Sequence, residues 1–297
     1  MIENFIKNYE YYKNVSLKKY NTYKIDVMCD LLIYPKNEEE LLELLKELRK
    51  TNIKYLFLGG GSNVILSKKH YDVVIKLDRL NKLEINENIV IAGAGLSLIS
   101  LANTCMKKGL NGLAFAGGIP GSVGASTAMN AGAYKEEMSD IIKEIKVITP
   151  NLDIKTMTNK ELNYSYRNSF LKENKDYICI ETTFKLSYED SVKIKEVMDK
   201  RRERRLESQP LDMPSAGSVF RNPEGLSAGK LIEDIGLKGY KIGGAQISTK
   251  HANFIVNIGN ATSDDIIELI EYTKKKVKEA YDIELILEQE IIWWYHG

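Results

Sequence analysis

Apolar positions along the first third of the chain recur at two spacings, those of strands and those of helices. Leucines three and four positions apart predict a helix at 37–50, in which Asn37 and Glu40 have the spacing of a capping box. The segments 2–13 and 97–108 also predict helices, the first of them short and amphipathic. Apolar runs of strand length occur at 29–35, 54–59, 72–77, 82–86 and 88–92. A βαβ start followed by further strands is typical of an α/β or α+β protein.

The rest of the chain also contains predicted strands and helices, and prolines cluster after a charged helix. Strands are predicted at 140–149, 177–187, 253–257 and 284–292, and helices at 189–207, 227–235 and 263–280. Three of the six prolines follow the charged helix at 189–207 closely. Because prolines and polar residues gather at domain boundaries, one domain is predicted over 1–192 and a second over 193–297.

Composition and charge restrict the class of protein. Charged residues make up 28% of the chain and the net charge is +1, so no global field attracts nucleic acid or an anionic membrane. The first residues lack the apolar core of a signal peptide, and no uncharged apolar stretch approaches the about 20 residues of a membrane span. The three cysteines and three histidines form no metal or redox motif. We therefore expect a cytoplasmic protein with reduced thiols and no metal.

Glycines gather in three segments, at 59–61, 109–132 and 217–244. Glycine tolerates positive φ and allows the backbone to approach a ligand closely. In LGGGSN, Gly59 to Asn63 follow a predicted strand, so successive N–H groups would form a nest for a phosphate, with a wide hairpin turn as the alternative. The segment FAGGIPGSVGASTAMNAGAY would let a planar or phosphorylated ligand lie against backbone, with close packing of elements as the alternative. IAGAG lacks the third glycine of a dinucleotide fingerprint and predicts only a strand-to-helix turn.

Single polar residues in three other segments are suited to chemistry, with ordinary surface positions as the alternative for each. Arg167 lies among aromatic residues in YSYRNSF, where partial desolvation would suit it to bind a carboxylate. Ser218 in SAGSVFRNP has no histidine partner in sequence, so it is better suited to donate a proton than to act as a nucleophile. Glu284, Glu288 and Glu290 share one face of the last predicted strand, and periodicity does not indicate which of them turns inward.

These motifs, with NTYKI at 21–25, AGKLIEDIGLKG at 228–239 and LEQEI at 287–291, resemble those of the UDP-N-acetylenolpyruvoylglucosamine reductases. The similarity runs in order over nearly the whole chain, and the short stretch after YSYRNSF resembles the shorter, type II members. The resemblance implies an α+β fold, with an FAD-binding domain of the vanillyl-alcohol oxidase (PCMH) type in two subdomains and a C-terminal α+β substrate-binding domain. It also implies NADPH-dependent reduction of UDP-N-acetylglucosamine enolpyruvate to UDP-N-acetylmuramate through bound FAD, a step in peptidoglycan precursor synthesis.

The resemblance further assigns roles to individual residues. Arg167, Ser218 and Glu290 would be catalytic: Arg167 would stabilise negative charge, and Ser218 would protonate C2 after hydride reaches C3. Flavin contacts would involve Gly59, Gly60, Gly61, Ser62, Asn63, Gly118, Ile119, Pro120, Gly121, Ser122, Gly124, Asn130, Ala131 and Gly132. Substrate contacts would involve Tyr166, Arg221, Asn222, Gln246 and His251.

Two other functions remain open at this point. One is a related FAD-dependent oxidase or dehydrogenase with another substrate, and the other is a non-catalytic nucleotide-binding module. The second leaves Arg167, Ser218 and Glu290 without a common task. The expected partners are the enolpyruvyl sugar nucleotide and NADPH, without nucleic acid or membrane insertion, and a monomer is predicted.

Overall fold

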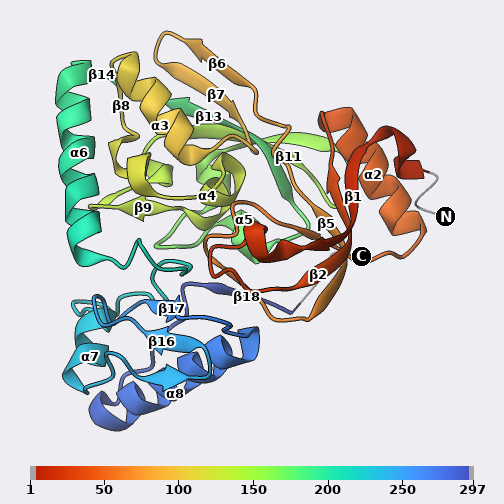
Figure 1. The fold of residues 1–297 in the computed structure, drawn as a ribbon. Coiled ribbons are helices and arrows are strands. Elements are labelled where there is room, and N and C mark those ends of the chain that lie inside the picture. The colour runs from red at the N-terminus through yellow and green to blue at the C-terminus, as the bar shows by residue number, and fades with distance from the viewer. Residues whose placement is uncertain (1–4, 294–297) are drawn as a thin grey trace.

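The structure is a computed structural model that describes residues 5–293 (Figure 1). Its first sheet has the strand order β1-β2-β5-β3, with β1 antiparallel and the other strands parallel. These strands are Glu10–Ser16, Met28–Tyr34, His70–Ile75 and Tyr55–Phe57. Helix α2 (Glu38–Lys50) packs its four buried leucines on this sheet. The Asn37 side chain accepts a hydrogen bond from the Glu40 amide at 2.9 Å, so the predicted helix start is confirmed.

The N-terminal segment forms strand β1 from Glu10 onward, so the helix predicted at 2–13 is wrong in its second half. Among the described residues of this segment, Phe5 and the 3-10 turn Ile6–Asn8 are helical, and residues 1–4 lie outside the described part of the chain. Strand β1 pairs with β2 along its whole length, from Glu10 opposite Tyr34 to Ser16 opposite Met28. Pairing with an existing sheet satisfies the backbone of β1, whereas an isolated helix this short is marginal in water.

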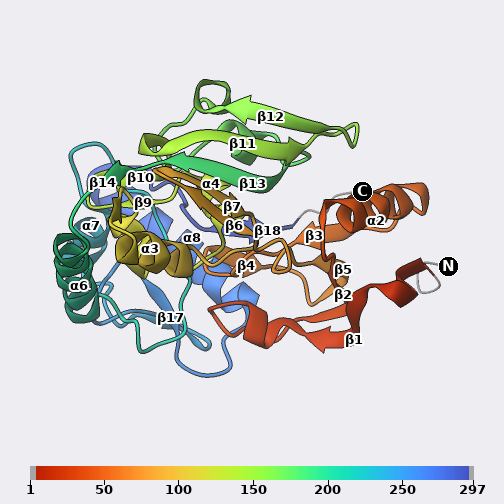
Figure 2. The same cartoon turned by 90° about the horizontal axis from the view of Figure 1, so that it is seen from above.

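The second sheet has five antiparallel strands in the order β12-β11-β13-β7-β6. They are Ile154–Thr158, Ile142–Ile148, Ile178–Lys185, Ile89–Gly93 and Leu83–Asn86. Helices α3 (Leu98–Lys107) and α4 (Val123–Met129) contribute to the same hydrophobic core as this sheet. The sequence patterns missed β12, an edge strand with one buried residue, and α4, whose small residues form no apolar stripe. Figure 2 shows β11–β13 and β1 on opposite sides of β4 and β18.

A C-terminal lobe follows helix α6 (Ser191–Ser208), which contacts α3 and the 3-10 turn η3 (Ala114–Gly118) of the first part (Figure 1). Apolar residues of this lobe and of the first sheet form one hydrophobic core. The lobe contains the antiparallel sheet β15-β16-β17 with helices α7 and α8. These elements are Lys241–Ile242, Ala245–Ile247, Ile255–Asn257, Ala228–Asp234 and Ser263–Tyr281. The domain boundary predicted at 192/193 falls at the start of α6 and stays a prediction.

The last strand returns from this lobe to the first part of the chain. Strand β18 (Glu290–Ile292) pairs in parallel with β4 (Val64–Leu66), which directly follows the first glycine segment. The strand predicted at 284–292 is therefore confirmed only at its end, because the preceding residues cross between the two parts. The remaining short elements are Leu17–Tyr20, Leu110–Asn111, Ala114–Gly118, Gly132–Ala133, Glu136–Glu137, Met138–Asp140, Asn159–Leu162, Phe170–Glu173 and Ser187–Tyr188. Within residues 5–293, no helix combines the length and apolarity that a membrane crossing needs.

Candidate active site

A cavity of about 1170 Å³ lies between the first part of the chain and the C-terminal lobe. Its walls come from both glycine-rich loops of the first part, the segment after Arg167, the end of α6 and the segments 213–218 and 288–292. Pockets for a single small ligand usually measure about 300–1,000 Å³. The cavity therefore has room for a large cofactor together with part of a second ligand.

The two glycine-rich loops touch each other at the wall of this cavity. A methyl group on Gly60 would lie 2.8 Å from the Cα atom of Gly121, so side chains are excluded where the loops meet. The Ser62 hydroxyl donates a hydrogen bond to the Pro120 carbonyl at 2.7 Å. Gly61 has φ of +64°, and a methyl group there would lie 2.1 Å from the Tyr20 carbonyl oxygen. The two motifs that the sequence singled out thus form one backbone-lined surface.

Basic residues at the end of α6 form another wall. Arg204, Arg205 and Ser208 line the cavity. Burial lowers the pKa of Arg205, and its Nη1 atom lies where a methyl group on Gly118 would be only 2.6 Å away. The arginine side chain therefore lies directly against the backbone of Gly118. A guanidinium here is suited to an anionic group such as a phosphate.

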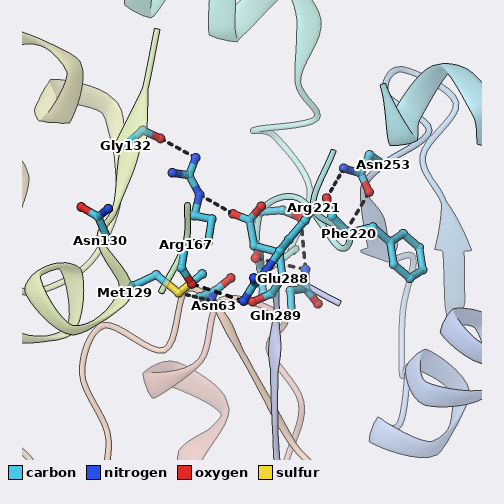
Figure 3. A network of polar contacts seen from close by, with 12 residues as sticks. Asn63, Met129, Asn130, Gly132, Arg167, Phe220, Arg221, Asn253, Glu288 and Gln289 are labelled. Carbon is cyan, nitrogen blue, oxygen red and sulfur yellow. Dashed lines mark hydrogen bonds and ion pairs between the residues drawn. The ribbon is translucent and has the colours of Figure 1, made fainter. Parts of the chain in front are cut away.

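Arg167 occupies the centre of the polar network in Figure 3. Its backbone has φ of +56°, and its guanidinium donates from Nη2 to the Gly132 carbonyl at 2.7 Å. The Nε atom donates to Oε1 of Glu288 at 3.1 Å (Figure 3). Both side chains are largely removed from solvent, because Arg167 is 16% exposed and Glu288 is 15% exposed. Their ion pair is consequently weakly screened by water.

Ser218 lines the cavity next to a segment that is fixed by backbone and amide contacts. The amide N–H of Glu288 donates to the Val219 carbonyl at 2.8 Å. The Asn253 side chain binds both the N–H and the carbonyl of Phe220, at 2.9 and 2.8 Å (Figure 3). Ser218 and Glu288 therefore belong to adjacent, hydrogen-bonded stretches of chain.

Lysines that the sequence patterns did not identify complete this part of the cavity. Lys175 forms an ion pair with Glu290, and both residues line the cavity. The Lys172 ammonium donates to the Arg167 carbonyl at 3.2 Å and lies 3.3 Å from the Met129 sulfur. Burial, and then the positive charge of Arg221, lower the pKa of Lys172. Both lysines lie shortly after Arg167 in the sequence, which was the available signal, but lysines are ordinarily surface residues.

The structure brings most of the predicted site residues to the cavity and leaves others outside its lining. Those that line it are Gly59, Gly60, Gly61, Ser62, Asn63, Ile119, Pro120, Gly121, Ser122, Gly124, Ala131, Gly132, Arg167, Ser218 and Glu290. Those outside the lining are Gly118, Asn130, Tyr166, Arg221, Asn222, Gln246 and His251. Asn130 is fully buried, and its amide group binds the carbonyl of Ser165 and the N–H of Ser139, both at 3.0 Å.

The predicted substrate residues outside the lining make contacts within the protein. Asn222 accepts a hydrogen bond from Ala228 at 3.0 Å, and Gln246 donates to Gly239 at 2.9 Å. His251 accepts from the Asn253 amide at 3.2 Å. Two others lie next to Arg167: Tyr166 has its ring 5.0 Å from the guanidinium carbon, and Arg221 donates to the Arg167 carbonyl at 3.3 Å. The roles expected for these five residues stay predictions.

Known proteins resemble this chain over nearly its whole length. A family model described as "UDP-N-acetylenolpyruvoylglucosamine reductase, C-terminal domain" matches residues 209–292, and one described as "FAD binding domain" matches residues 29–158. A UDP-N-acetylenolpyruvoylglucosamine reductase from Caldanaerobacter subterraneus subsp. tengcongensis is 42% identical over 98% of this chain and 96% of its own. The chain belongs to the UDP-N-acetylenolpyruvoylglucosamine reductase family.

Other members of the family agree in sequence and in structure. The reductase of Clostridium perfringens (strain SM101 / Type A) is 43% identical over 91% of this chain and 89% of its own. The crystal structure of the reductase from Thermus caldophilus has a TM-score of 0.80 and 33% identity, covering 96% of this chain and 98% of that one. The predicted fold class, an FAD-binding domain followed by a C-terminal α+β domain, is confirmed.

The residues at the cavity fit the flavin that the family match indicates. The glycine loops meet at a surface that no side chain fills, which suits a large planar or phosphorylated group held against backbone. The Lys76 ammonium donates to the Gly59 carbonyl at 2.7 Å and so fixes the start of the first loop. Arg204 and Arg205 offer positive charge on the wall formed by α6. The size of the cavity leaves space beside the cofactor for a substrate near Arg167 and Ser218.

Proposed function

We propose that the protein reduces UDP-N-acetylglucosamine enolpyruvate to UDP-N-acetylmuramate, with FAD as bound cofactor and NADPH as co-substrate. One observation carries the proposal: the glycine loops, Arg167, Ser218 and Glu290 line the same cavity. The names of the relatives, reductases of an enolpyruvoyl sugar, agree with this activity. The proposal includes NADPH as co-substrate, a cytoplasmic location and a monomeric state, because these are expected from the sequence.

FAD, when bound, supplies the hydride that is added to C3 of the enolpyruvyl group. Negative charge then develops at C2 and spreads into the adjacent carboxylate. Arg167 is placed to stabilise that charge, because the Nη1 atom of its guanidinium has no hydrogen-bond partner among residues 5–293. A positive group fixed before the reaction lowers the barrier more than one that must reorient during it.

Ser218 would donate the proton to C2. A serine hydroxyl is a very weak acid in water, so the transfer depends on nearby positive charge and a short path. Arg167 and Lys172 supply positive charge on the same cavity wall. Glu290, paired with Lys175, would orient the proton donor or a water molecule that returns to Ser218 the proton it loses.

The test follows the visible spectrum of the purified protein without oxygen. NADPH should bleach the flavin band, and UDP-N-acetylglucosamine enolpyruvate should restore it. Ser218→Ala should leave flavin reduction by NADPH unchanged and abolish reoxidation by the enolpyruvyl substrate. The first step thus serves as the control for the second in the same variant. A band that returns only with oxygen would replace the proposal by the oxidase alternative. Equal loss of both steps in Ser218→Ala would refute the role of Ser218.

A further inference from the structure

We infer that Glu288 is a positioning residue for Arg167: its carboxylate fixes the plane of the guanidinium so that the free edge faces the substrate. The inference rests on the proposed function and adds a residue to it. The sequence placed Glu288 on the same strand face as Glu290, but only the three-dimensional structure shows which carboxylate Arg167 meets.

The guanidinium has two acceptors at fixed positions. Nε donates to Oε1 of Glu288 at 3.1 Å, and Nη2 donates to the Gly132 carbonyl at 2.7 Å (Figure 3). A planar group bound through two of its nitrogen atoms cannot rotate about its long side chain. Nη1 remains available for a ligand carboxylate. Without Glu288, one hydrogen bond to a backbone carbonyl would be left to orient a mobile side chain.

Glu288 is itself held by its backbone. Its N–H donates to Val219 at 2.8 Å, and its carbonyl accepts from Nδ2 of Asn63 at 3.2 Å (Figure 3). Asn63 closes the first glycine loop, and Val219 follows Ser218 directly. Glu288 thus connects the cofactor-binding loop, the segment of the proton donor and the catalytic arginine. Because two hydrogen bonds fix its backbone, Glu288 can hold the Arg167 guanidinium in one position.

The neighbouring carboxylate has a different partner, which separates the two roles. Glu290 pairs with Lys175, so Arg167 does not depend on Glu290 for its orientation. Loss of the Glu288 carboxylate would leave Arg167 free to turn toward Glu290 or into the cavity. A displacement of about 1 Å at a reacting centre costs on the order of a hundredfold in rate.

The experiment measures both flavin half-reactions of the holoenzyme in an anaerobic stopped-flow instrument. The variants are Glu288→Ala, which removes the acceptor, and Glu288→Gln, which keeps an acceptor oxygen without charge. Glu284→Ala is the matched control, an exposed glutamate just upstream. We expect Glu288→Ala to slow flavin reoxidation by the enolpyruvyl substrate about 10- to 100-fold while reduction by NADPH stays unchanged. Glu288→Gln should recover most of that loss, and the control should behave as wild type.

A binding measurement on the oxidised holoenzyme separates positioning from simple loss of structure. Isothermal titration with UDP-N-acetylglucosamine, which lacks the enolpyruvyl carboxylate, should give the same Kd for all variants. The enolpyruvyl substrate should bind Glu288→Ala within about threefold of wild type, because a positioning defect lowers the rate more than the affinity. Failure of the wild-type flavin to reoxidise would refute the proposed function rather than this inference.

Three results would overturn the inference while the proposed function stands. The first is a Glu288→Ala variant with wild-type reoxidation. The second is a Glu288→Gln variant as slow as Glu288→Ala, since charge rather than geometry would then be decisive. The third is equal loss of both half-reactions or of UDP-N-acetylglucosamine binding, which would make Glu288 a general structural residue.

Discussion

Removing the Tyr23 hydroxyl should destabilise the contact between the start and the end of the chain. Tyr23 is fully buried and its hydroxyl donates to Oε1 of Gln289 at 2.9 Å, while Gln289 is 3% exposed. Burial raises the pKa of Tyr23, so the hydroxyl remains a donor across the ordinary pH range. Tyr23→Phe leaves the amide oxygen buried without its partner, which costs about 1–3 kcal/mol.

Equilibrium unfolding in urea, with circular dichroism as the signal, measures this loss. The midpoint should fall while the slope stays constant, because the surface exposed on unfolding does not change. Tyr188→Phe is the matched control: its side chain is 66% exposed, and such a surface change is expected to stay within about 0.5 kcal/mol.

A double-mutant cycle with Gln289→Leu tests whether the hydrogen bond itself is responsible. The Gln289 amide also donates to the carbonyls of Ala216 and Gly217, both at 3.1 Å, so Gln289→Leu alone should cost more than Tyr23→Phe. The coupling between the two changes should be about 0.5–3 kcal/mol. A coupling of zero, or a Tyr23→Phe variant as stable as the control, would refute the reasoning.

Two further predictions follow from buried titratable groups. Lys172→Met should raise the stability of the ligand-free protein in urea at pH 7, because burial disfavours the ammonium and lowers the pKa of Lys172 below 10.5. Between this lowered pKa and 10.5, the folded state holds fewer protons than the unfolded state, so the stability of the wild type rises with pH. The advantage of the variant should therefore shrink as the pH rises through that range. A variant less stable than the wild type at pH 7 would contradict this prediction. Burial also raises the pKa of Cys29 and Cys179 to about 11 and of Cys105 to about 12. A thiol reagent at pH 8 should therefore label none of them in the native protein and all three in urea, and native labelling would contradict their burial.

The elements that the sequence predicted well are those whose signal is local. Asn37 and Ser227 start helices as their capping chemistry indicates, because both the cap and the apolar stripe lie within a few residues. The segment 123–129 forms a helix without such a stripe, since small residues are needed where it packs against the second sheet. Strand β1 was misread because its pairing partner β2, rather than its own pattern, decides its conformation.

In the candidate site too, some residues could be predicted from local motifs and others could not. Arg167 and Ser218 stand in distinctive motifs, and the structure places both at one cavity. The partner of Arg167 could not be predicted, since period two puts Glu288 and Glu290 on the same face of a strand. The register of β18 against β4 fixes Glu290, whereas Glu288 precedes β18 and is held by hydrogen bonds to Val219 and Asn63. Local patterns contain no information about that register.

The return of the chain end explains how residues from two parts act at one place. The N–H of Glu290 donates to the Asn63 carbonyl at 2.9 Å, and the N–H of Glu288 donates to Val219, next to Ser218. The backbone hydrogen bonds of Glu288 therefore reach both parts of the chain, Val219 in the C-terminal lobe and Asn63 in the first part, to which Arg167 also belongs. The Glu288–Arg167 ion pair adds a contact between these two parts, close to the segment that contains Ser218. The contacts that join the two parts of the chain are thus also those that bring Arg167 and Ser218 to one cavity.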